Sequence, residues 1–108
     1  MMRNVMVMLG MGMLLACLAQ PALAKTYAVT IKNGKCIPAK LTITAGDTVE
    51  FTNDDNKDHR IQANDGVFDS GKLKPGESYK VKLSKPGTYA YACALHPREK
   101  GTVIVKKK

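Results

Sequence analysis

The chain has 108 residues, of which 44% are hydrophobic and 24% charged, and its formal net charge is +8. A chain of this length accommodates one small domain, which excludes a multidomain protein. The positive charge is combined with only 6% aromatic residues and no tryptophan, so the aromatic and basic stripe of many nucleic-acid-binding proteins is missing and we expect no nucleic-acid partner.

The N-terminal segment has the composition of an export signal. All six methionines lie within residues 1–13, and Arg3 is the only charged residue before Lys25. An apolar run over residues 5–19 and the sequence Ala-Leu-Ala at 22–24 complete the layout of a secretory signal peptide. The run is shorter than the about 20 apolar residues of a membrane-spanning helix, so we expect no integral membrane span. We therefore predict a cleaved signal peptide at 1–24, a single domain at 25–108 and a periplasmic protein.

An alternative processing site lies at Cys17. The sequence Leu-Leu-Ala-Cys that ends there resembles a lipobox, and processing at this point would leave a protein that is lipid-anchored at Cys17. Cleavage before Lys25 has the cleaner signal of small residues. Residues 25–108 would keep 16 of the 17 basic residues and all 9 acidic residues, a net charge of +7, with two cysteines, two histidines and no methionine.

The predicted domain alternates apolar and polar residues with period two, which is typical of half-buried strands. The alternating segments are 27–31, 41–43, 49–51, 79–83, 89–91 and 103–105, and residues 59–63 fit one more short strand. Turn sequences such as Asn33-Gly34 separate these segments, and none of them has a helical period. The pattern predicts an all-β Greek-key sandwich or barrel of about seven to eight strands.

The densest reactive chemistry lies near the C-terminal end. Cys93 and His96 are separated by two residues after a predicted strand, so their thiolate and imidazole can reach one metal ion. His59 is the only other histidine and is the candidate for a third ligand. Two histidines and one cysteine with a weak axial ligand are the pattern of a blue-copper electron-transfer site.

The chain resembles the cupredoxins, in particular the small plastocyanin and amicyanin type. The resemblance covers essentially all of residues 25–108, and its strongest segments are 37–53, 68–71, 75–79 and 86–97. Of these, 68–71 and 75–79 are similar to the family's middle strands. It implies that His59, Cys93 and His96 are the equatorial ligands of one copper ion. It also implies that electrons enter and leave through the exposed edge of His96.

One position departs from the family pattern. The shortest ligand loops of the family read Cys-x-x-His-x-x-Met, and Glu99 stands at the methionine position. A carboxylate is harder and more anionic than a thioether, so Glu99 as axial ligand would favour Cu(II), lower the potential and admit zinc or cobalt more readily. In the alternative, Glu99 points to solvent and pairs with Arg98 or Lys100.

Cys36 is the second departure, and three interpretations of it stay open. It is a small buried thiol that fills core space, a disulfide partner of Cys93 in an oxidising compartment, or an extra thiolate ligand of the metal. The disulfide would imitate the inter-sheet bridge of immunoglobulin domains, but those domains carry a buried tryptophan and this chain has none.

These features predict an exported, monomeric one-electron carrier with one copper ion that alternates between Cu(I) and Cu(II). The alternative is a copper-handling protein for sequestration, delivery or tolerance, because the changed axial position and Cys36 suit storage. We expect no enzymatic activity, since the sequence has no second metal set and no substrate-sized insertion. Its dispersed lysines either steer an acidic redox partner or serve solubility and edge protection.

Overall fold

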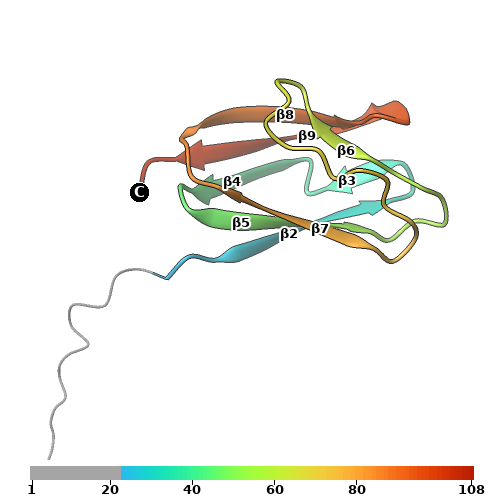
Figure 1. Cartoon of the computed structure of the whole chain (residues 1–108), viewed down its shortest axis with the longest axis horizontal. Coiled ribbons are helices and arrows are strands. Elements are labelled where there is room, and N and C mark those ends of the chain that lie inside the picture. The colour runs from blue at the N-terminus through green and yellow to red at the C-terminus, as the bar shows by residue number, and fades with distance from the viewer. Residues whose placement is uncertain (1–22) are drawn as a thin grey trace, which may run out of the picture.

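The computed structural model describes residues 23–108 (Figure 1). Most of the predicted signal peptide, including the alternative lipid-anchor position Cys17, lies outside the described residues. The described part of the chain consists of strands and connecting loops, so it offers no helix that could cross a membrane. The strands are β2 (Thr26–Lys32), β3 (Lys35–Ile37), β4 (Lys40–Thr44), β5 (Asp47–Asn53), β6 (Ile61–Ala63), β7 (Ser78–Leu83), β8 (Gly87–Cys93) and β9 (His96–Lys106).

The strands form two four-stranded sheets that pack face to face (Figure 1). One sheet has the order β3-β2-β5-β7 and the other the order β4-β9-β8-β6. The pairs β2–β5 and β4–β9 are parallel, so the chain crosses between the sheets before it returns beside these strands. The predicted all-β sandwich is confirmed, whereas the barrel alternative is wrong because the two sheets remain separate.

The core lies between the sheets because each strand turns its apolar face inward. In β5, Val49 and Phe51 are fully buried and alternate with half-buried polar residues. The ring of Phe51 meets that of Tyr91 edge-on, with 5.1 Å between the ring centroids, a favourable aromatic arrangement. Tyr91 precedes Cys93 by two residues on β8, so the aromatic core extends toward the candidate ligands.

Three segments differ from the strands that the sequence predicts. β3 is absent from the prediction; it follows the Asn33-Gly34 turn, where the φ angles of +53° and +74° produce a tight hairpin. β9 already begins at His96, so residues predicted to form a loop lie on an extended strand. Residues 68–71, predicted from the resemblance as part of the middle strands, form only an isolated bridge between Asp69 and Gln62.

The two ends of the sandwich carry different features (Figure 1). The hairpin between β8 and β9 lies at one end, together with the loop that follows β5. The turn between β4 and β5 lies at the opposite end, where the described chain also begins and where Lys108 is located. We call these the hairpin end and the terminal end.

Candidate metal centre

Four side chains with metal-binding atoms converge at the hairpin end: His59, Cys93, His96 and Glu99, whose donor atoms all lie within 4.8 Å of one another. The sulfur of Cys93 is 3.5 Å from Nδ1 of His59 and 3.6 Å from Nδ1 of His96. Oε1 of Glu99 is 2.9 Å from Nδ1 of His59 and 3.6 Å from Nδ1 of His96. Within residues 23–108 this is the only group of its kind.

A change of register between β8 and β9 positions two of these residues. The strands pair in step as far as Ala92 and Lys100, and the next pair is Cys93 with His96. The residues between His96 and Lys100 therefore have no partner on β8. Such an irregularity bends a strand and redirects its side chains, and here it turns Glu99 inward, to 8% exposure, between exposed neighbours.

His59 is held from its backbone and from its ring. Its N–H donates to the carbonyl of Leu73 at 3.0 Å, and its own carbonyl accepts from the Leu73 N–H at 2.7 Å. In the fully buried ring, Nε2 lies 3.0 Å from Oδ2 of Asp55. A carboxylate at this distance accepts a hydrogen bond from Nε2–H. The proton is then on Nε2, so the lone pair of Nδ1 is available to a metal. The hydrogen bond from His59 also lowers the pKa of Asp55, which keeps that carboxylate ionised.

The loop that carries Asp55 is shaped by Asn53, a fully buried side chain. Nδ2 of Asn53 donates to the carbonyls of Lys57 and Leu73, each at 2.8 Å. Its Oδ1 accepts from the N–H of Asp55 at 3.0 Å. The prediction from sequence missed both Asn53 and Asp55. The only available signal was the position of Asp55 four residues before a candidate ligand.

Cys93 is fully buried and receives a backbone hydrogen bond. The N–H of Arg60 lies 3.4 Å from its sulfur, and the carbonyl of Arg60 accepts from the N–H of Ala94 at 2.7 Å. These bonds fix β8 against the start of β6. An N–H that points at sulfur stabilises the negative charge of a thiolate and tunes the potential of a bound metal.

His96 is the member of the group that reaches solvent. Its side chain is 34% exposed, compared with 0% for His59 and 10% for Glu99. The two imidazole rings have centroids 5.1 Å apart, and both turn Nδ1 toward Cys93. The outer edge of His96 therefore connects a buried donor set with the surface.

The surroundings of the Glu99 carboxylate indicate whether a cation fits this site. Its Oε1 is buried and has no hydrogen-bond partner among the described residues, although Nδ1 of His59 is 2.9 Å away. The two atoms are thus in contact without the alignment of a hydrogen bond. A buried carboxylate is costly without a compensating charge, and a cation among the four donors would supply that charge.

The burial and the neighbours of the Glu99 side chain show which way it points. The alternative in which Glu99 faces solvent and pairs with Arg98 or Lys100 is wrong, because its side chain is 10% exposed and faces the two histidines. Its second oxygen lies under the turn at Gly34, where a Cβ atom would approach it to 3.3 Å. The donor set of one thiolate, two imidazoles and one carboxylate suits copper and also zinc or cobalt.

Cys36 lies outside the four-residue group. It is 4% exposed, and both it and Cys93 are free thiols, so the disulfide interpretation is wrong. Burial raises the pKa of Cys36 to about 11, and the nearby Glu99 and Cys93 add to this increase. A thiol that stays protonated at neutral pH is a poor ligand and an unreactive group, which favours the interpretation as core filler.

Comparisons with known proteins agree with this geometry. Residues 5–105 match the family model of the cupredoxin-like domain. Amicyanin-alpha of Methylorubrum extorquens is 33% identical over 92 residues, which cover 81% of this chain and 77% of that protein. Amicyanin of Paracoccus versutus is 28% identical over 88 residues, which cover 77% of this chain and 67% of that protein. The solved structure of a purple cupredoxin from Nitrosopumilus maritimus has a TM-score of 0.70 at 32% identity and covers 74% of this chain and 99% of its own.

Proposed function

The chain belongs to the cupredoxin-like family, and from this membership we propose that it is an exported electron carrier that binds one copper ion through His59, Cys93, His96 and Glu99. The observation that carries the proposal is the convergence of these four donors, one of them a buried carboxylate oxygen without a hydrogen-bond partner. Bound copper would supply a centre that exchanges single electrons between Cu(I) and Cu(II).

The protein's contribution is to hold the donors in place. His59 is fixed by the backbone of Leu73 and by Asp55, and Cys93 by the N–H of Arg60. Donors that are positioned before the metal binds have little to rearrange when its charge changes. The exposed edge of His96 gives a partner protein access to this otherwise buried group.

Export and cleavage before Lys25 are part of the proposal. The support is the signal-like sequence of residues 1–24 and the exposure of Leu23, which is 81% exposed and precedes the first strand. N-terminal sequencing of the protein recovered from the periplasm should begin at Lys25. A lipid-modified chain that begins at Cys17 would support the anchored form instead.

A copper-handling role is the second candidate, and the buried Glu99 favours it. An anionic oxygen ligand stabilises Cu(II) relative to Cu(I) and lowers the potential. A site that holds one oxidation state tightly is suited to sequestration or delivery.

Voltammetry separates the two functions. The purified protein is loaded with Cu(II), checked by visible and EPR spectra, and examined on an electrode. A reversible one-electron wave supports the carrier, whereas tight copper binding without a reversible wave supports the handler. Absence of a thiolate-to-copper absorption band would contradict both.

Glu99→Gln should raise the copper potential by about 100 to 200 mV, because it removes a negative charge beside the metal, and a unit charge at close range is worth about 4 kcal/mol at an effective dielectric constant of about 20. The EPR and visible spectra should change as well, since one of the four donors would change from a carboxylate to a neutral amide. Glu50→Gln removes the same charge from the half-buried outer side of β5 and should leave the spectra unchanged. Spectra and potential that Glu99→Gln leaves unaltered would show that Glu99 is not a ligand.

Asp55→Asn should weaken copper binding by about 10- to 100-fold, the usual cost of losing a carboxylate that orients a metal-binding histidine. A competition titration with a chelator of known affinity measures the change. Asp54→Asn is the matched control, because Asp54 is 60% exposed and pairs with Lys32 at 3.6 Å. Equal copper affinities of the two variants would show that Asp55 does not support copper binding.

A further inference from the structure

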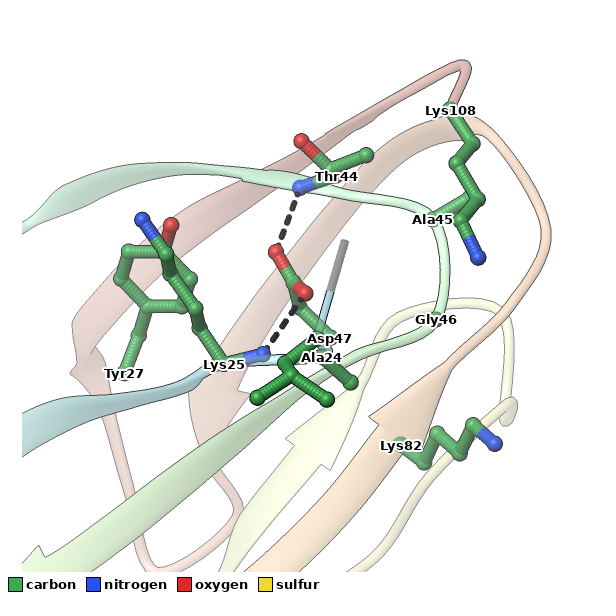
Figure 2. A pocket seen from close by; sticks show the side chains of 10 residues that line it. Ala24, Lys25, Tyr27, Thr44, Ala45, Gly46, Asp47, Lys82 and Lys108 are labelled. Carbon is green, nitrogen blue, oxygen red and sulfur yellow. Dashed lines mark hydrogen bonds between the residues drawn. The ribbon is translucent and has the colours of Figure 1, made fainter. Parts of the chain in front are cut away.

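A second polar feature lies at the terminal end, opposite the candidate metal centre (Figure 2). A cavity of about 300 Å³ lies between the start of the described chain and the turn that joins β4 to β5. Among the described residues, Asp47 is the only acidic one that lines it, and it is 6% exposed. Its carboxylate accepts hydrogen bonds from the backbone N–H groups of Lys25 and Thr44, each at 3.0 Å.

Both backbone groups of Lys25, its nitrogen and its carbonyl, form hydrogen bonds. Its nitrogen donates to Oδ1 of Asp47, and its carbonyl accepts from the N–H of Thr48 at 2.8 Å. Leu23 and Ala24, directly before it, are exposed. The bonded part of the N-terminal strand thus begins at the nitrogen that cleavage after Ala24 would release.

Cleavage at this point changes the chemistry of that nitrogen without requiring it to move. Water supplies the oxygen that makes Ala24 a new carboxylate, and the nitrogen of Lys25 leaves as an amine that is protonated at neutral pH. The hydrogen bond to Asp47 then joins an ammonium to a carboxylate. The acceptor of this bond is ionised before cleavage, and cleavage makes the donor charged as well, which adds a direct Coulomb attraction between the two groups.

We propose that Asp47 is a binding site for the α-ammonium group that cleavage creates at Lys25, so that processing itself adds an ion pair to the folded domain. The inference rests on the cleavage included in the proposed function. The hydrogen bonds from Lys25 and Thr44 lower the pKa of Asp47 and so keep it ionised as the partner.

The other side-chain charges that line the cavity are all positive. The side chains of Lys25, Lys82 and Lys108 line the cavity, and Tyr27 adds a phenol. The lysine side chains are exposed, so solvent screens their repulsion of the ammonium. The carboxylate, in contrast, is in direct contact with the nitrogen of Lys25.

The ion pair gives stability a defined pH dependence. An unpaired α-amino group has a pKa of about 7.7 to 8.0, and pairing with Asp47 raises this value in the folded protein. The added stability is therefore fully present from the pH at which Asp47 is ionised up to about pH 7.7, and it is lost as the pH rises through the raised folded pKa. In a chain that keeps Leu23 and Ala24, the nitrogen of Lys25 is an amide and this dependence is absent.

The test compares chains 25–108 and 23–108, each with and without Asp47→Asn. The buried apolar residues lie within 29–105, so both chains contain the whole domain. Urea unfolding at pH 6.5 should show that Asp47→Asn reduces the folding equilibrium constant about tenfold more in 25–108 than in 23–108, and at pH 10 the difference should vanish. Equal losses in the two chains at pH 6.5 would overturn the proposal.

A second measurement does not depend on the variant's folding. The α-amino group of unaltered 25–108, followed by NMR, should titrate above pH 8, and titration at the unpaired value would overturn the proposal. Both chains have defined N-termini. A negative result therefore refutes the role of Asp47, while N-terminal sequencing of the exported protein separately tests the cleavage.

Discussion

Cys93→Ser should abolish the intense visible absorption of the copper-loaded protein and weaken copper binding by more than about 100-fold. The absorption needs a thiolate bound to copper, and serine supplies only a neutral hydroxyl at neutral pH. Loss of a supporting hydrogen bond at a metal site already costs about 10- to 100-fold, so the loss of a fully buried central donor should cost more. Visible spectra and a chelator competition measure the two effects.

Cys36→Ser is the matched control. It changes the same atom in the other buried cysteine, which lies outside the four-residue group. Its absorption band should keep its position and intensity. A band that persists in Cys93→Ser, or disappears in Cys36→Ser, would show that the thiolate ligand has been assigned to the wrong residue.

Gly101→Ala should lower the free energy of unfolding by about 3 kcal/mol, at the upper end of what overpacking a core costs. A Cβ atom at this position would overlap the hydroxyl of Tyr91, approach its Cζ to 2.5 Å and the carbonyl oxygen of Ala39 to 2.9 Å. The ring cannot retreat easily because it packs against Phe51 and Phe68. The Ala39 carbonyl is also fixed, since it accepts from the N–H of Thr102 at 2.8 Å.

Gly66→Ala provides the comparison for this substitution. Gly66 has a φ of +80° and open space where a Cβ would stand, so alanine there costs only backbone strain of about 1–2 kcal/mol. Urea denaturation of the metal-free variants measures both losses. Equal losses would mean that Tyr91 and Ala39 can move aside, and that the strand pair is packed less tightly at Gly101 than its contacts indicate.

The fold was largely predictable because most strands bury one face. Apolar and polar residues therefore alternate with period two along these strands. β3 escaped because a three-residue strand with one buried residue, Cys36, has no period to detect. It exists because the preceding turn forces the chain back beside β2. The early start of β9 escaped for another reason: its first residues are mostly exposed, and of these only His96 pairs with β8, opposite Cys93.

At the candidate metal centre, residue type and spacing were enough to select His59, Cys93 and His96, and alignment with the family pattern selected Glu99. Asp55 could not be selected in this way. The segment 53–70 contains five aspartates, and composition does not rank them. What distinguishes Asp55 is the shape that Asn53 imposes on the loop, a tertiary effect that depends on the distant carbonyl of Leu73.

The separation of the two ends of the sandwich has a consequence for attachment. The start of the first strand and Lys108 both lie opposite the hairpin that carries His96 (Figure 1). A linker or lipid joined to either terminus would therefore attach the molecule to a support by its terminal end. The hairpin end, with the imidazole edge of His96, would then face away from the support. Immobilised in this orientation, the protein would leave the end that carries His96 open to a diffusing partner.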